Sequence, residues 1–177
     1  MGRSPATRPK SKKTVPILEI AEFVIAYFKI NGDPIDQLKL QKILYYIQAW
    51  HLANFGTPLF EEEPEAWVNG PVYRSVYNKY KRFKDRPIQL SIENIETVLQ
   101  EKKMKLKLSK NTEKLIEEVL RIYGKMDTFG LVYLTHLDQP WTDARKGLKP
   151  FDASSNKITF DSMMLYYKKL LKERTDK

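Results

Sequence analysis

Few residues of this chain have the types and spacing that catalysis or metal binding requires. The two histidines, His51 and His136, stand far apart, and neither has a second histidine or a cysteine nearby, so the spacing of a metal site is absent. The glycines form neither a phosphate-binding loop nor a dinucleotide-binding fingerprint, and no Gly-x-Ser-x-Gly motif is present. We therefore predict no catalytic residue, no metal and no cofactor, and a protein that is not an enzyme.

The acidic residues that follow residue 60 are the remaining candidates for acid–base chemistry. Glu61, Glu62, Glu63 and Glu65 precede a turn, without the apolar surroundings that raise the pKa of a carboxylate. We interpret the run as a solvated surface cluster, with a weak alternative as an attachment point for a basic partner. An enzyme that uses His136 is kept as a third, weaker hypothesis.

A polar and aromatic group stands out near the end of the chain. Thr135 and His136 close one predicted helix, and Pro140, Trp141 and Arg145 follow on a short one. Trp141 and Arg145 are four residues apart, so the guanidinium can lie over the indole. Two interpretations stay open. Either His136 and Arg145 are buried and tie loops to helix ends, or the group belongs to a binding surface, where Trp and Arg are enriched.

These side chains must be positioned by helices, and the central helix is predicted over 38–55. Its apolar residues fall on two opposite faces of a helical wheel, so both faces must be covered. Asp36 is expected to cap its start and Gly56 to follow its end. Between the faces lie two narrow polar strips: Lys39, Lys42 and Tyr46 in one, Gln41 and Gln48 in the other. We expect a helix that is mainly core, with the strips as a thin edge available to a partner.

The rest of the chain predicts mostly helices. They are expected at 15–28, 71–83 with Pro71 at the first helical position, 91–100, 112–123, 127–136, a short turn from 140, and a last one capped by Asp161. Alternating patterns admit an extended piece at 66–68 and short strands at 88–90, 104–108 and 158–160. The sequence therefore predicts a mainly α fold, a compact single-domain bundle of about six or seven helices with at most a small β element.

Composition limits the remaining choices. A chain of 177 residues with 42% hydrophobic residues fits one folded domain, and the absence of cysteine rules out disulfides and thiolate sites. No apolar run approaches the roughly 18–20 residues of a membrane span, and the start lacks the apolar core of a signal peptide. We expect a cytoplasmic protein without membrane contact.

The formal charge of +9 is unevenly placed. Arg3, Arg8, Lys10, Lys12 and Lys13 supply five positive charges with no acid between them. Residues 1–14 are therefore expected to form a basic, disordered arm, followed by a domain at 15–174 with a lysine-rich insertion near 101–110. A basic arm can also bind nucleic acid. The pI near 9.5 and the mixed Lys, Arg and Tyr residues at 73–82 keep a nucleic-acid-binding protein as the rival hypothesis.

Three blocks of residues, in order and spacing, resemble the Panacea domain, the SocA-type antitoxin family of bacteria and their phages. The first block is Leu38-Lys39-Leu40-Gln41-Lys42 with Leu44-Tyr45-Tyr46, Trp50 and Pro58-Leu59-Phe60. The second is Glu65-Ala66-Trp67 with Gly70-Pro71-Val72, and the last is Leu134-Thr135-His136 with Pro140-Trp141 and Ala144-Arg145. The resemblance covers roughly residues 15–147.

This resemblance implies a helical, non-enzymatic domain that neutralises a toxin encoded by a neighbouring gene, usually by direct protein–protein binding. The family pairs one domain with many unrelated toxin types, and at least one member is an adaptor that delivers its toxin to a protease. The basic arm and the segment 101–110 depart from shorter members. Insertions of this kind are places where partner specificity can lie.

We predict that this chain binds its toxin through one surface that occludes the toxin's active site or substrate groove. The central helix's strips and the turn before Pro71 are expected to form it. The candidate partner-binding residues are Lys39, Gln41, Lys42, Tyr46, Trp67, Asn69, Gly70, Pro71, Tyr73, His136, Trp141 and Arg145.

Overall fold

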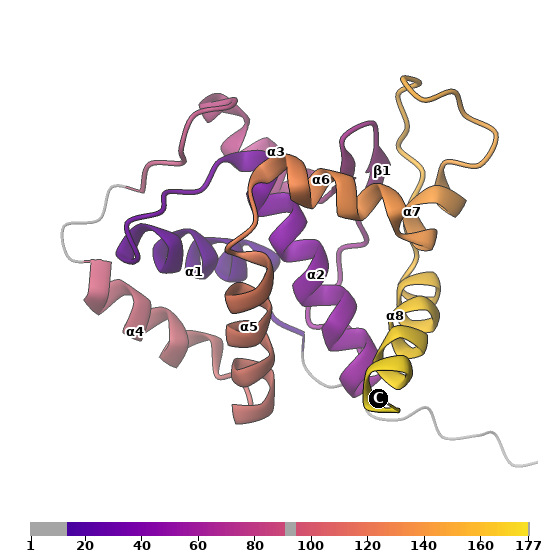
Figure 1. Ribbon diagram of the computed structural model, residues 1–177. Helices are drawn as coiled ribbons and strands as arrows, with labels where there is room; N and C mark the ends of the chain where they lie inside the picture. Colours follow the sequence, from indigo (N-terminus) through magenta and orange to yellow (C-terminus); the bar gives the residue numbers. More distant parts are fainter. Residues whose placement is uncertain (1–13, 91–94, 177) are drawn as a thin grey trace, which may run out of the picture.

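The computed structural model describes residues 14–90 and 95–176, so the predicted basic arm lies almost entirely outside the described residues. Within those ranges the chain forms eight α-helices, one 3-10 helix and one two-stranded sheet (Figure 1). In chain order these are α1 (Ile17–Ile30), α2 (Gln37–Phe55), β1 (Glu65–Trp67), β2 (Gly70–Val72), α3 (Arg74–Tyr80), η1 (Lys81–Phe83), α4 (Ile95–Leu106), α5 (Lys110–Tyr123), α6 (Thr128–Leu137), α7 (Gln139–Ala144) and α8 (Phe160–Thr175). The mainly α prediction is confirmed, with slightly more helices than expected.

Helix α2 is the centre of the fold, as its two apolar faces predicted. The carboxylate of Asp36 accepts a hydrogen bond from the backbone N–H of Lys39 at 2.7 Å and so caps the helix. Helices α8 and α5 pack along α2 most extensively, and α6 crosses near its amino-terminal end (Figure 1). An aromatic group joins these helices, with Tyr46 stacked on Tyr123 at 3.9 Å between ring centres. Burial of this group supplies much of the core.

Helix α4 packs against α1, with ion pairs across the contact. Lys105 contacts Glu19 at 2.7 Å, and Lys102 contacts both Glu19 and Glu22. The strand expected at 104–108 is wrong, because this segment is the end of α4 followed by a turn. The alternation of Met, Leu and Lys at 104–108 indicates a strand only if the preceding helix ends at residue 100, and this helix continues to Leu106.

The chain between α2 and α3 folds into a tight hairpin. Trp67 pairs with Gly70 across a two-residue loop, and Gly70 has a φ of +94°, which favours glycine. Pro71 was expected to begin a helix, and this is wrong: it lies in β2, and α3 begins at Arg74. Pairing of 70–72 with 65–67 keeps this segment extended.

The returning segment before α8 runs beside the hairpin. The N–H of Ala66 donates to the carbonyl of Asn156, and the N–H of Ile158 donates to the carbonyl of Pro64, both at 2.8 Å. Only a single bridge between Glu65 and Lys157 forms there, so the strand expected at 158–160 is wrong, as is the one at 88–90. β1 is thereby covered on its outer edge.

Two glutamates of the acidic run cap helices from a distance. Glu62 accepts hydrogen bonds from the N–H and hydroxyl of Ser75 near the start of α3, and Glu63 accepts from the N–H of Phe160 at 2.9 Å. Thr159, not the predicted Asp161, provides the local cap of α8. The run is therefore partly structural rather than a purely solvated cluster. Within the described ranges, no helix has the length and apolar character needed to cross a membrane.

Candidate protein-binding groove at the hairpin

The polar side chains of α2 hold the hairpin and the loop before it. The amide of Gln41 both donates to the carbonyl of Tyr73, at 3.3 Å, and accepts from its N–H, at 2.8 Å. Gln48 makes a similar pair of contacts with the segment between α2 and β1. Its amide donates to the carbonyl of Phe60 and accepts from the N–H of Leu59. Side chains of the central helix thus provide hydrogen bonds to buried backbone N–H and carbonyl groups that lie outside the two-stranded sheet.

The expectation that these polar strips form an exposed edge is wrong. Lys42 and Gln48 are fully buried, and the other three are at most 9% exposed: Lys39, Gln41 and Tyr46. The hairpin, α6 and α8 cover the positions that a helical wheel leaves open. These strips therefore leave little exposed surface for a partner.

Lys42 is the most unusual of these residues. Its ammonium group donates to the carbonyl of Pro71 at 3.0 Å, and burial lowers the pKa of Lys42 to about 7. The backbone of Gly70 approaches so closely that a Cβ there would lie 2.8 Å from the Lys42 nitrogen and 2.6 Å from the Thr135 hydroxyl. All three blocks of the sequence resemblance meet at this point.

The late polar and aromatic group holds the hairpin from its other side. The Arg145 guanidinium donates to the carbonyl of Ala66 at 2.8 Å, and the Trp141 indole donates to the carbonyl of Trp67 at 3.0 Å. The predicted stacking is confirmed, with the Arg145 guanidinium 5.3 Å from the Trp141 ring centre. His136 stacks on Trp141 at 4.2 Å, and burial lowers the pKa of His136. For Arg145 the structural interpretation is confirmed, since it is 7% exposed and bound to carbonyls.

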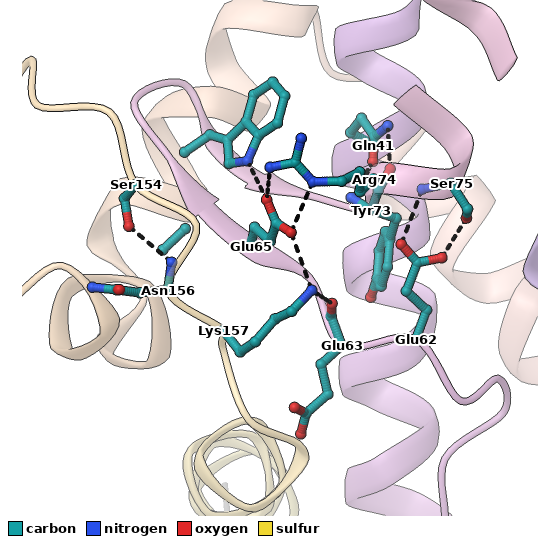
Figure 2. Close-up of polar contacts among 12 residues, drawn as sticks. Gln41, Glu62, Glu63, Glu65, Tyr73, Arg74, Ser75, Ser154, Asn156 and Lys157 are labelled. Atoms are coloured by element: carbon teal, nitrogen blue, oxygen red, sulfur yellow. Dashed lines mark hydrogen bonds and ion pairs between the residues drawn. The ribbon is translucent and has the colours of Figure 1, made fainter. Parts of the chain in front are cut away.

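Glu65 organises the exposed side of the hairpin (Figure 2). Its carboxylate accepts hydrogen bonds from Arg74, from the Trp67 indole at 2.8 Å and from Lys157 at 3.2 Å. Burial alone would raise the pKa of Glu65, but these donors outweigh it and lower the pKa to about 2. The carboxylate is therefore ionised at neutral pH, which fixes the positions of Trp67 and Arg74.

Beside this network lies a groove of about 780 Å³. The hairpin tip, the start of α2 and α3 with η1 line it, and a small-residue loop closes it opposite. Its lining residues are Gln37, Leu38, Gln41, Trp67, Val68, Asn69, Val72, Arg74, Tyr77, Lys81, Lys84, Asp85, Ala153, Ser154 and Ser155. A largely apolar hollow with a few convergent polar groups is typical of a binding site.

Three of the predicted partner-binding residues line this groove: Gln41, Trp67 and Asn69. Asn69 is exposed at the hairpin tip, and Trp67 is half-buried. The others do not line it: Lys39, Lys42, Tyr46, Gly70, Pro71, Tyr73, His136, Trp141 and Arg145. Tyr46 instead stacks on Tyr123 in the core, and Lys39 lies over the Phe28 ring. Tyr77, Lys81 and Lys84 also line the groove but were not among the predicted partner-binding residues, although the segment 73–82 was singled out for the nucleic-acid hypothesis. The spacing of Arg74, Tyr77 and Lys81 on one face of a helix was the available signal.

A second apolar surface lies on α6. Phe129, Tyr133 and Leu137 follow each other at intervals of four residues and are 81%, 65% and 58% exposed. Such a stripe forms one face of a helix. Apart from the Tyr133 hydroxyl, these three side chains carry no polar group that would define a ligand. Among the described residues, no group of His, Asp and Glu has an arrangement that could hold a metal ion.

Comparison with known proteins gives one match. Residues 40–142, more than half of the 177 residues, match the family model described as "Antitoxin SocA-like, Panacea domain". The matched segment runs from α2 through the hairpin to α7, and therefore contains most of the groove. No curated protein and no solved structure matches this chain significantly.

Proposed function

Because this chain belongs to the SocA-like antitoxin family with a Panacea domain, we propose that it neutralises a toxin protein by binding it directly. Family membership supports an antitoxin role in general and implies a toxin as the partner. Direct binding, and the absence of catalysis by the chain itself, are our proposal.

The groove at the hairpin is the observation that carries this proposal. Its lining combines aromatic and aliphatic side chains with exposed amide and lysine groups. Aromatic residues are enriched in the cores of protein interfaces, where they provide most of the binding energy. Buried polar contacts from α2, α6 and α7 hold the hairpin, so the surface is formed before a partner arrives.

Because the groove surface is ordered before binding, the free energy of binding is more favourable. A surface that is already ordered loses little conformational entropy on binding, so more of the contact energy appears as affinity. Specific inhibition of a toxin needs about 1,200–2,000 Å² of total buried area. The groove, the hairpin tip and the adjoining faces of α3 and η1 together form a continuous surface on which a toxin's active-site region can sit.

The test is co-expression with the product of the neighbouring gene. We expect that product to arrest growth when expressed alone and to be harmless together with this chain. The two purified proteins should elute as one complex from a size-exclusion column. A harmless neighbour, or toxicity that this chain does not relieve, would contradict an antitoxin role.

The same experiment separates direct neutralisation from delivery to a protease. Under direct binding, the amount of toxin in the cell stays constant or rises when this chain is co-expressed, and rescue persists in strains that lack individual cytosolic proteases. Loss of the toxin, with rescue abolished in one protease-deficient strain, would identify an adaptor instead.

Nucleic-acid binding is less well supported by the described domain. Its folded candidate was the segment 73–82, and two of the basic residues there are paired: Arg74 with Glu65 and Lys79 with Glu22, both at 2.5 Å. Pairing of this kind reduces the charge available for phosphates.

A further inference from the structure

We propose that the groove receives an acidic segment of the partner toxin, anchored by one bulky apolar side chain. This inference rests on the proposed function and specifies the chemistry of the partner at that site. It follows from two features of the groove, an apolar floor and a rim of lysines for which no ion pair is found among the described residues.

The floor is shaped for an apolar side chain. The ring of Trp67 packs against that of Tyr77 with their centres 4.8 Å apart, and both line the groove together with Leu38. Trp67 and Leu38 are half-buried, so each keeps some apolar surface in contact with water. Covering such surface with an aliphatic or aromatic side chain is favourable by roughly 25 cal/mol per Å² of apolar area.

The rim is basic, and its charges differ in how they are compensated. Arg74 binds Glu65 through two nitrogens, so its charge is matched within the domain. Lys81 and Lys84 are exposed and line the groove, and no ion pair is found for either among the described residues. Among the described residues that line the groove, Asp85 is the only acid. The rim therefore favours carboxylates on the partner, which would be attracted before contact.

The position of Lys84 supports a role beyond solubility. Its backbone has a φ of 53°, a region that favours glycine. A lysine therefore occupies a position where its backbone conformation is costly, directly at the edge of the groove. Backbone conformations of this kind are concentrated at functional sites.

Two observations favour a protein segment over single-stranded nucleic acid. The Arg74 guanidinium lies over the Trp67 ring, 5.2 Å from its centre, and so occupies a face on which a base would stack. The opposite wall consists of Ala153, Ser154 and Ser155, which carry no charge. A phosphate backbone is normally followed by basic groups along its length, whereas here they lie on one rim.

The experiment measures the affinity of the purified chain for the purified product of the neighbouring gene. The double variant K81E/K84E reverses the rim charge at two exposed residues. It should weaken binding by about tenfold or more, mainly by slowing association, and should reduce the salt dependence of the association rate. The matched control is K168E/K169E, which makes the same charge change at two exposed lysines of α8 outside the groove. The control should leave the affinity nearly unchanged.

A second pair of variants tests the floor. Val68→Asp adds a negative charge in the hairpin loop at the groove and should also weaken binding, whereas Leu165→Asp, at a residue that is 77% exposed on α8, should not. A photo-reactive p-benzoyl-phenylalanine in place of Ser155 should then cross-link to a toxin peptide that contains Asp or Glu beside a large apolar residue. Thermal unfolding of each variant confirms that it is folded.

The outcomes separate this inference from the proposed function. If the wild-type chain neither binds nor neutralises the toxin, the proposed function fails. If it does both while K81E/K84E behaves like K168E/K169E, or if the cross-linked peptide lacks acidic residues, the inference is overturned and the antitoxin role stands. Binding of a labelled single-stranded oligonucleotide that K81E/K84E abolishes would show a nucleic acid as the occupant and would also overturn it.

Discussion

The buried ammonium nitrogen of Lys42 lies 3.0 Å from the backbone carbonyl oxygen of Pro71 and donates a hydrogen bond to it. This contact joins the central helix to the second strand of the hairpin. It places an ionisable group where water is excluded, next to a glycine whose missing side chain makes the approach possible. The stability of the hairpin therefore depends on pH.

For Lys42 the sign follows from a folded-state pKa of about 7 against an ordinary value of 10.5. As pH falls from about 10 to 7, the unfolded chain gains a proton that the folded chain does not, so the free energy of unfolding decreases. Lys42→Met should remove this slope. In urea unfolding, the free energy of unfolding of the wild type should rise by about 3 kcal/mol between pH 7 and 9.5, whereas that of Lys42→Met should stay nearly constant. Parallel pH profiles would contradict this.

Gly70→Ala should destabilise the domain by roughly 2–4 kcal/mol, because it adds a steric clash to a strained backbone. The added Cβ would meet the Thr135 hydroxyl at 2.6 Å and the Lys42 nitrogen at 2.8 Å. Gly32→Ala is the control, since Gly32 also has a positive φ but has nothing within 4 Å of an added Cβ. Gly32→Ala should lower the free energy of unfolding only through backbone strain, by roughly 1–2 kcal/mol. If thermal or urea unfolding shows the same loss of stability for both variants, the close packing around Gly70 does not contribute to stability.

Arg145→Lys should be strongly destabilising although the charge is kept. The guanidinium donates to the carbonyls of Ala66, Lys149, Pro150 and Asp152, which a single ammonium cannot reach together. We expect a loss of roughly 2–3 kcal/mol in the free energy of unfolding. Arg121→Lys, at an exposed residue that pairs with Glu118 at 3.6 Å, should change the free energy of unfolding by less than about 0.5 kcal/mol. If Arg145→Lys lowers the free energy of unfolding no more than Arg121→Lys does, the structural role of Arg145 is contradicted.

Asp138 should give the opposite pH dependence from Lys42. Burial raises the pKa of its carboxyl to about 6 from 3.8, and the Tyr167 hydroxyl donates to it. The folded chain thus holds a proton that the unfolded chain has lost, and the stabilisation present below pH 4 disappears as pH rises to about 6. Asp138→Asn should remove this decline and be no less stable than wild type at pH 7. Unfolding at pH 4, 5, 6 and 7 tests this, with Asp161→Asn as the control for an exposed carboxylate.

Trp67→Ala should affect binding more than stability. The ring is half-buried and its indole donates to Glu65, so we expect a loss of roughly 1–3 kcal/mol in stability, below the 3–5 kcal/mol of a fully buried Trp. Affinity for the toxin should fall at least about tenfold if Trp67 is an anchor. Phe129→Ala, in the exposed stripe of α6, is the comparison. A larger loss of affinity at Phe129 would move the partner surface to α6.

How far the sequence predicted the site can be followed at single residues. Gln41 and Lys42 stood out as polar residues in an apolar helix, and both bind the backbone of the hairpin segment, with Gln41 also lining the groove. Nothing local indicates this, because the groups they satisfy lie about 30 residues away along the chain. Trp67 and Asn69 were identified and do line the groove, whereas Tyr77 and Lys84 were missed because their roles depend on how α3 packs against the hairpin.

By itself the sequence determined the helical class, the central position of α2 and the resemblance to SocA-like antitoxins, since periodicity, caps and motif spacing are local properties. Tertiary structure alone decided that Pro71 belongs to a strand, that the lysines near residue 102 pair with α1, and which face of the molecule is hollow. Burial and long-range hydrogen bonding depend on every element that covers a residue. A polar side chain on a helical wheel therefore shows its chemistry but not whether water, backbone or a partner satisfies it.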